Sequence, residues 1–121
     1  MLDVESDGGL DKTRLVKSIE TALTEIERLS GQIPILYTAP SFWNTRVAAP
    51  AAPEWTGRHP LWIAHYTAAE KPIVPRGWTD WTLWQYTDRG SVAGVGGNVD
   101  RNRFNGYEAV TGVPGKAGGA A

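Results

Sequence analysis

The sequence contains no cysteine, which excludes disulfides, thiolate metal sites and a cysteine nucleophile. Its formal net charge is only −1, so it lacks the strongly basic balance that favours nucleic-acid binding. It also lacks any apolar run of about 18 residues, so we expect no membrane-spanning helix. Residues 1–9 are acidic and polar, without the basic start and apolar stretch of a signal peptide. We therefore expect partners other than nucleic acid and membrane.

The length of 121 residues suits one domain and hardly two, and 41% of the residues are hydrophobic. The clearest element is a helix over 11–30, with Asp11 as its N-cap and Gly31 as its stop. Its apolar residues recur at helical spacing, namely Leu15, Ile19, Ala22, Leu23, Ile26 and Leu29. This amphipathic pattern predicts a helix that packs one face on a core.

An apolar run at 33–39 predicts a strand buried on both faces, as in parallel sheets. The remaining predicted elements are a short helix at 41–47, a Pro/Ala loop at 48–53, aromatic-rich strands at 61–66 and 81–87, a glycine-rich turn from Gly90 to Gly97, and a last strand at 98–104. The order of strand, helix and strand fits a right-handed βαβ crossover, so we expect an α/β fold. Residues 108–121 predict a flexible Gly/Ala-rich tail behind a domain at 1–107.

Two carboxylates, Asp3 and Glu5, stand two residues apart and alternate with Leu2 and Val4, which indicates the end of a strand. Both would project to one face, with their Cα atoms about 6.6 Å apart. Like charges that close raise one pKa and keep that carboxyl protonated as a general acid near neutral pH. Glycoside hydrolysis uses such a pair. A solvated polar strand end explains the same three letters, because a lone D-x-E is a weak motif.

A calcium loop is a further interpretation of the acidic start. Asp3, Glu5, Asp7 and Gly8 match the first, third, fifth and sixth positions of an EF-hand loop. The last position of that loop is a bidentate Glu, and here it is Arg14, so the pattern fails.

Other candidate sites are weaker. His59 and His65 have no third ligand at metal spacing, and His65 is better explained as a hydrogen-bonded strand residue. The GVGG segment at 94–97 lacks the spacing and the strand-to-helix context of a phosphate loop, so it predicts a turn. The sequence contains no G-x-S-x-G and no candidate catalytic triad.

Several motifs follow the acidic start in a fixed order: DVES, PILYT, PLWIAHY, WTLWQYTDRG and GNVDRNRF. This order resembles the C-terminal half of glycoside hydrolase family 25, the Chalaropsis-type lysozymes or N-acetylmuramidases of bacteria, fungi and phage endolysins. The resemblance runs from Leu2 to about Asn105. It implies an irregular β/α (TIM-like) barrel, of which this chain would carry roughly the end of the fourth strand through the eighth. It also implies extracellular or cell-wall action and no metal or organic cofactor.

The resemblance assigns roles to individual residues. Glu5 matches the general acid/base, and Asp3 matches a partner that orients or stabilises the substrate's N-acetyl group in a retaining reaction. Asp100 matches an acidic residue at the floor of the groove, and Tyr37 matches a tyrosine that lines the saccharide site. Four further residues fall in strands around the pocket: Trp62, Tyr66, Trp84 and Gln85. Aromatic faces suit sugar rings, but tryptophans in barrel strands serve core packing at least as often.

The activity implied is hydrolysis of the β-1,4 bond between N-acetylmuramic acid and N-acetylglucosamine in peptidoglycan glycan strands. A chain that starts on the fourth strand lacks the first three strands and the aspartate expected on the first. We interpret it first as a fragment of a gene. A natural split product that pairs with an N-terminal half, or a half barrel that self-associates, are the alternatives, because open sheet edges invite pairing. A non-catalytic saccharide-binding or interaction fragment is the rival function.

Overall fold

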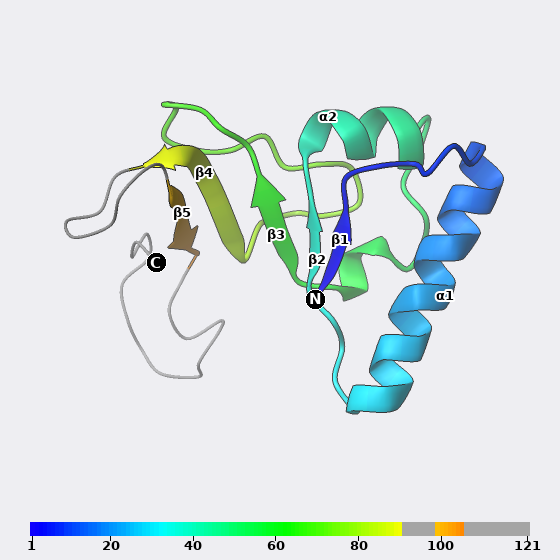
Figure 1. The fold of residues 1–121 in the computed structure, drawn as a ribbon. Coiled ribbons are helices and arrows are strands. Elements are labelled where there is room, and N and C mark those ends of the chain that lie inside the picture. Colours follow the sequence, from blue (N-terminus) through cyan, green and yellow to red (C-terminus); the bar gives the residue numbers. More distant parts are fainter. Residues whose placement is uncertain (91–98, 106–121) are drawn as a thin grey trace.

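The computed structural model describes residues 1–90 and 99–105, which form a five-stranded sheet with a long helix beside it (Figure 1). The strands follow chain order: β1 (Leu2–Val4), β2 (Leu36–Thr38), β3 (Leu61–Ala64), β4 (Leu83–Gly90) and β5 (Val99–Phe104). β1 to β4 pair in parallel, and β5 runs antiparallel to β4. The predicted α/β class is confirmed. The predicted turn at 94–97 and the predicted tail at 108–121 lie outside the described residues.

The helix α1 (Lys12–Ser30) connects β1 to β2, as the sequence predicts. The Asp11 side chain caps it by accepting a hydrogen bond from the Arg14 backbone N at 2.9 Å. Gly31 ends it in the left-handed region, with φ of 72°, and its N–H donates to the Glu27 carbonyl at 2.8 Å. The buried residues of α1 are three from the predicted apolar stripe: Leu15, Ile19 and Leu23. The prediction of this helix and both of its ends is confirmed.

The α1 face of the sheet carries the larger core cluster, which comprises Val4, Leu15, Ile19, Leu23, Leu36, Trp43, Val47 and Ala48. A short helical segment, α2 (Pro40–Phe42) continued as a π-helical turn (Trp43–Val47), closes one end of it and corresponds to the predicted helix at 41–47. Trp43 is fully buried there, and its Nε1 donates to the Arg76 carbonyl at 2.9 Å. The core therefore ties the loop after β3 back to the first half of the chain.

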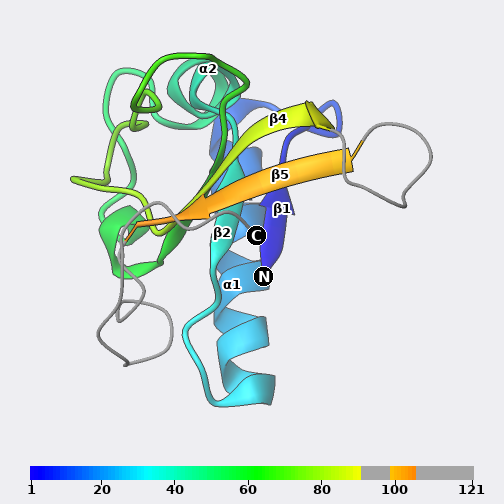
Figure 2. The same ribbon diagram turned by 90° about the vertical axis from the view of Figure 1, so that its left-hand side faces the viewer.

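A smaller cluster lies on the same face under β3 and β4, where Leu61, Ile63 and Trp84 pack together. Arg103 of β5 adds a cation–π contact from the same side, with its guanidinium carbon 4.7 Å from the centroid of the Tyr86 ring. Figure 2, seen from the β5 end of the sheet, shows β4 and β5 running side by side in front, with α1 behind them next to β1 and β2. The α1 face is thus apolar along the length of the sheet.

The strand predictions find the right segments but misplace their ends, and β4 continues to Gly90 rather than ending at residue 87. The run at 33–39 pairs only over Leu36–Thr38, because Pro34 has no N–H to donate to a ladder. β3 ends at Ala64 rather than residue 66, and β4 begins at Leu83 rather than residue 81. The pairing of neighbouring strands, which composition does not reveal, sets these limits.

Candidate active site

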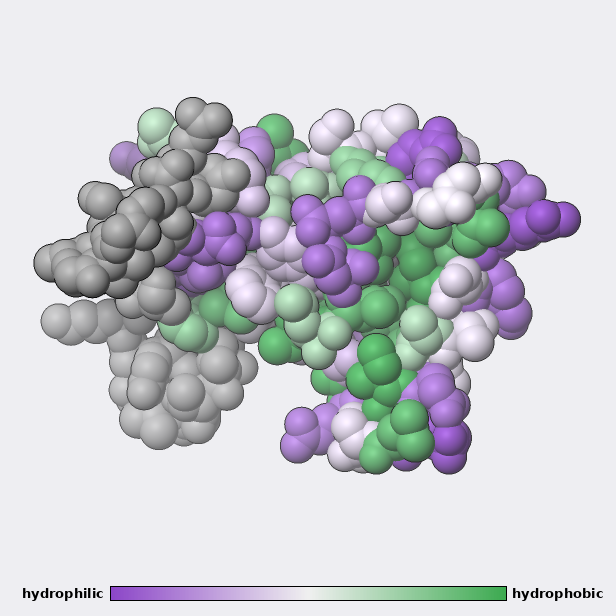
Figure 3. Space-filling view, in the orientation of Figure 1, coloured by the Kyte–Doolittle hydropathy of each residue, from purple (hydrophilic) through white to green (hydrophobic). Residues whose placement is uncertain are grey.

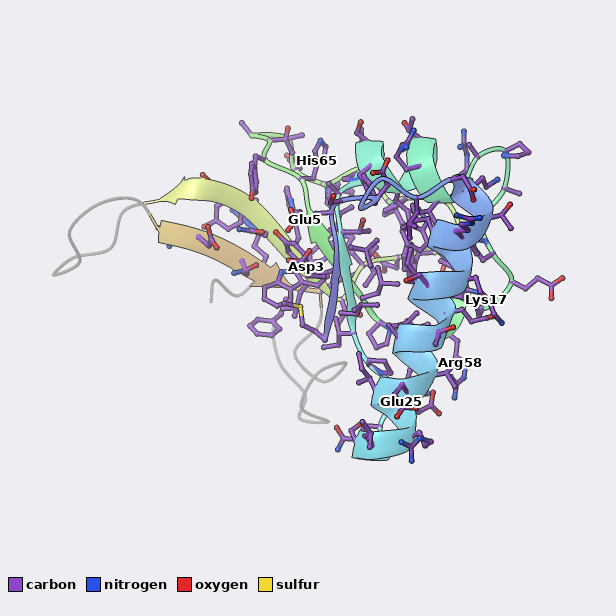
Figure 4. All side chains as sticks on the ribbon, turned by 45° about the vertical axis from the view of Figure 1, so that its right-hand side comes forward. Asp3, Glu5, Lys17, Glu25, Arg58 and His65 are labelled. Atoms are coloured by element: carbon purple, nitrogen blue, oxygen red, sulfur yellow. The ribbon has the colours of Figure 1, made fainter. Side chains whose placement is uncertain are left out.

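Asp3 and Glu5 project to the face of the sheet opposite α1, at the carboxyl end of β1 (Figure 4). Val4 between them is buried on the α1 side, and strand alternation sends its two neighbours the other way. Burial raises the pKa of the Glu5 carboxyl, and a hydrogen bond with Asp3 and the Asp3 charge raise this pKa further. Glu5 stays largely exposed, so it keeps access to a substrate while it holds its proton to higher pH than an ordinary glutamate.

Tyr37 lies directly beside this pair, because β2 pairs with β1 and the Cα partner of Asp3 is Tyr37. Its hydroxyl donates to Oε1 of the buried Gln85 and also takes part in a hydrogen bond with Tyr66. Burial first, and then the nearby Tyr66 and Glu5, raise the pKa of Tyr37 well above its ordinary value. Tyr37 is therefore a neutral hydroxyl fixed beside the carboxylates, and three residues predicted for the site come together there.

Trp62 follows on β3, where it is the Cα partner of Tyr37. The two rings meet nearly at right angles, with centroids 5.2 Å apart and planes at 81°. The Trp62 Nε1 donates to Oδ1 of Asn102 on β5 at 2.8 Å. The sequence analysis did not single out Asn102. Its position two residues after Asp100 in VDRNRF places both on the same face of a regular strand, which is the signal that could have found it.

The other predicted residues are more exposed. Asp100 lies on β5 and is exposed, and strand alternation puts it on the face that carries Asn102. Tyr66 follows β3 and is 52% exposed. Tyr66 thus lies at the margin of the surface formed by Asp3, Glu5 and Tyr37, and the role of Asp100 stays a prediction.

Trp84 departs from its predicted role. Its Cα partner on β3 is Ile63, so it points to the α1 face, away from Glu5. There it is 2% exposed, and its Nε1 donates to the His65 carbonyl at 2.8 Å. Adjacent strand residues face opposite ways, so Gln85 and Trp84 do not line the same pocket. Trp84 is therefore a core residue rather than a sugar contact.

The third carboxylate of the acidic start serves the turn before α1. Asp7 accepts a hydrogen bond from the Gly9 backbone N at 2.9 Å and pairs with Arg46. These two partners, Gly9 first, lower the pKa of Asp7. Gly9 has φ of 79°, a conformation that glycine adopts readily. Asp7 is thus a structural residue, in contrast to Asp3 and Glu5.

The two histidines are structural as well. His59 is buried, and its Nδ1 donates to the Pro34 carbonyl at 3.1 Å. His65 accepts a hydrogen bond at Nδ1 from the Ile73 backbone N at 3.1 Å, so it is hydrogen-bonded as predicted. Within residues 1–90 and 99–105, no three His, Asp or Glu side chains gather in a way that could hold a metal ion. No helix in that part of the chain is long and apolar enough to span a membrane.

The chain is similar to proteins of known activity. A family model described as "Glycosyl hydrolases family 25" matches residues 1–95. Lysozyme M1 of Streptomyces globisporus is 44% identical over 78 residues, which cover 62% of this chain and 24% of that protein. The N,O-diacetylmuramidase of Chalaropsis sp is 30% identical over 110 residues, which cover 83% of this chain and 51% of that protein.

Solved structures of lytic enzymes also superpose on this chain. The bacterial lysozyme from Streptomyces coelicolor superposes with a TM-score of 0.76 at 33% identity, covering 89% of this chain and 51% of that chain. The spore cortex lytic enzyme SleM from Clostridium perfringens superposes with a TM-score of 0.68 at 37% identity, covering 84% of this chain and 35% of that chain. The chain therefore spans about half, or less, of the length of the relatives it matches.

Proposed function

We propose that this chain, which belongs to glycosyl hydrolase family 25, contributes the acid/base half of a peptidoglycan-cleaving active site. The substrate is the glycan strand of peptidoglycan, and the bond is the β-1,4 link between N-acetylmuramic acid and N-acetylglucosamine. The names of the relatives, lysozyme and N,O-diacetylmuramidase, support this substrate class. The site of action that follows is the cell wall, outside the cell.

One observation carries the proposal: two carboxyl groups share a strand end, and one holds its proton more tightly than usual. The raised pKa of Glu5 suits a general acid that gives its proton to the glycosidic oxygen as the bond to the sugar breaks. The resulting Glu5 carboxylate then accepts a proton from the attacking water. Asp3 has the second role, in which its carboxylate orients the N-acetyl group or stabilises positive charge at the sugar ring. Asp100 would add negative charge at the floor of the substrate groove.

Residues of neighbouring strands complete the proposed sugar site. Tyr37 presents a neutral hydroxyl next to Asp3, and Gln85 fixes that hydroxyl through a hydrogen bond. Trp62 offers an aromatic ring suited to the apolar face of a hexose, and Tyr66 lies exposed at the margin. These contacts come from parallel strands whose carboxyl ends meet at one edge, which is where α/β folds place their sites.

We further propose that the sheet is part of an irregular β/α barrel that a partner completes. In the described part of the chain β1 pairs with β2 alone, which leaves its other edge open. A groove of about 790 Å³ runs along α1 and is lined by small or apolar side chains together with charged ones, namely Leu10, Thr13, Ser18, Thr21 and Ala22 with Arg14, Lys17 and Glu25. Figure 3 shows hydrophobic residues gathered over the region of β1 and α1. An edge strand beside a helix groove fits a further strand–helix unit, and relatives of about twice the length support an N-terminal half as its source.

The alternative function is saccharide binding without turnover. The chain spans about half the length of its matched relatives, yet it contains the side chains of Tyr37, Trp62, Gln85 and Asn102. Tyr37 is hydrogen-bonded to Gln85, Trp62 is hydrogen-bonded to Asn102, and the two aromatic rings are in contact. A chain with this set alone would hold a glycan strand. In the competing arrangement the chain self-associates, and the open edge of β1 pairs with a second copy of the chain.

The experiment is release of reducing ends from purified peptidoglycan by the 121-residue chain, alone and with the corresponding N-terminal half of the Streptomyces coelicolor lysozyme. Glu5→Gln tests the acid, and Glu54→Gln is the matched control, because Glu54 lies exposed in the turn before the short helix at Thr56–Arg58, away from both the site and the groove along α1. We expect turnover that Glu5→Gln abolishes and Glu54→Gln leaves unchanged. Turnover that survives in Glu5→Gln contradicts the assignment. A folded chain that binds peptidoglycan but releases no ends, even with the added half, establishes the binding alternative instead.

A further inference from the structure

Asn102 reaches Trp62 from two strands away. The Trp62 Nε1 donates to the Asn102 Oδ1 at 2.8 Å, although Trp62 lies on β3 and Asn102 on β5. The register pairs Trp62 with Leu83 and Asn102 with Gln85, so the bond crosses over β4 and is offset by two residues along it. Two strand spacings amount to about 9.5 Å. The bond therefore fixes the indole in an orientation that lies across β4 toward β5.

A second restraint acts on the same indole. Tyr37 packs against Trp62 at a right angle, and the Tyr37 hydroxyl is itself bonded to Gln85. Gln85 is the Cα partner of Asn102 on the neighbouring strand. Two amide side chains that are neighbours on the β4–β5 ladder thus hold one aromatic ring each. The angle between the two rings depends on both amides.

We propose that Asn102 is a positioning residue of the saccharide site: it holds the Trp62 indole in the orientation in which the ring contacts the apolar face of an N-acetylhexosamine beside Glu5. This inference rests on the proposed function. Trp62 is half-buried and shares its face of the sheet with Asp3 and Tyr37, so part of the ring is open on the substrate side. A ring that stacks on a sugar must present its face, and the indole N–H is the group that defines the ring's rotation.

The bond is not needed to hold β5 in place. β5 is paired with β4 on both sides of Asn102, at Arg103 and, after a shift of register between Gln85 and Thr87, at Arg101. On the opposite face the Arg103 guanidinium lies over the Tyr86 ring, and beyond the strand the Asn105 Nδ2 donates to the Trp81 carbonyl at 2.7 Å. Loss of the Asn102 acceptor should therefore free the indole while β5 stays paired.

The test compares three variants of the ¹⁵N-labelled 121-residue chain. Asn102→Leu removes the acceptor at similar size, Asn102→Asp keeps an acceptor oxygen, and Asn105→Leu is the matched control that removes an amide bonded elsewhere. The first readout is the indole N–H resonance of Trp62, assigned with Trp62→Phe, and its hydrogen exchange. The second is the Kd for chitotetraose, a soluble N-acetylglucosamine tetrasaccharide.

We expect Asn102→Leu to shift the Trp62 indole resonance, to speed its exchange and to weaken chitotetraose binding about fivefold, the equivalent of one ordinary hydrogen bond. Asn102→Asp should restore both readouts, and Asn105→Leu should change neither. An unchanged indole resonance in Asn102→Leu overturns the proposal, as does a displaced indole with unchanged affinity. If Asn102→Leu does not fold, Asn102→Ser, whose hydroxyl is too short to reach, replaces it.

Failure of the proposed function looks different. If the wild-type chain binds no chitotetraose, the sugar role of Trp62 falls, and the inference with it. If the chain binds chitotetraose but Glu5→Gln has no effect on turnover, the catalytic assignment fails while the role of Asn102 in binding stands. The indole resonance and the reducing-end assay therefore report on separate claims.

Discussion

The hydrogen bond between Tyr37 and Gln85 gives a stability prediction that can be worked from the structure. Tyr37→Phe removes the donor and leaves Oε1 of Gln85, a residue that is 4% exposed, without that partner. A buried acceptor left unsatisfied costs about 1–3 kcal/mol, so we expect about 1.5 kcal/mol for this change. Gln85→Met removes the acceptor, but the Tyr37 hydroxyl keeps its bond with Tyr66, so this change should cost about 1 kcal/mol.

The double variant should cost less than the sum, because it removes both polar groups and leaves nothing unpaired between them. We expect a coupling free energy of about 1 kcal/mol in the double-mutant cycle. The assay is equilibrium unfolding of the 121-residue chain in urea, followed by far-UV circular dichroism. With an m-value of about 1.5 kcal/mol/M, Tyr37→Phe should lower the urea midpoint by about 1 M.

A matched cycle provides the control. Gln32→Met makes the same chemical change at an exposed residue just beyond α1, so its cost should add to that of Tyr37→Phe. Costs for Tyr37→Phe and Gln85→Met that add within about 0.4 kcal/mol would refute the reasoning, because unlinked sites add to that accuracy. Such a result would mean that the two side chains do not form the bond that fixes Tyr37 beside the carboxylates.

Two further predictions concern the caps of α1 and the titration of Glu5. Asp11→Ala and Gly31→Ala should each lower the free energy of unfolding by about 1 kcal/mol. Asp11→Ala removes the N-cap, and Gly31→Ala forces an alanine into the left-handed region at φ of 72°. Thermal unfolding that leaves both variants at the wild-type Tm would contradict this. Asp3→Asn should lower the pKa of Glu5, since it removes a negative neighbour, and ¹³C NMR titration of the Glu5 carboxyl measures it; an unchanged or raised pKa counts against the pairing. Because the folded-state pKa of Glu5 is raised, its ionisation costs stability as pH rises through that pKa, and Glu5→Gln should remove this slope.

The sequence predicts α1 fully because its determinants are local. The apolar period, the capping side chain of Asp11 and the left-handed Gly31 all lie within the helix or beside it. Strand limits depend on hydrogen bonds to distant segments, so the run at 33–39 could be assigned as a strand while its paired part, Leu36–Thr38, could not. The same holds for β3, whose end shifts by two residues, and for β4, whose start shifts by two and whose end shifts by three.

The candidate site could be predicted in part for the same reason. Asp3 and Glu5 stand out locally, and strand alternation puts both on one face. Alternation also says that Trp84 and Gln85 face opposite ways, but only the pairing of β4 with β3 decides which of them meets Tyr37. The role of Asn102 depends on a bond across an intervening strand, which no local pattern encodes.

The sheet divides stability and chemistry between its two faces. On the α1 side, Val4, Leu36 and Ile63 are at most 5% exposed and hold no polar group that a substrate could use. On the other side, the neighbouring positions carry Asp3, Tyr37 and the remaining polar residues of the site. Because the side-chain period of a strand is two, a slip of one residue in any pairing would bury the carboxylates and expose the core. The apolar face therefore specifies the register, and the register brings the acid, the hydroxyl and the aromatic ring together.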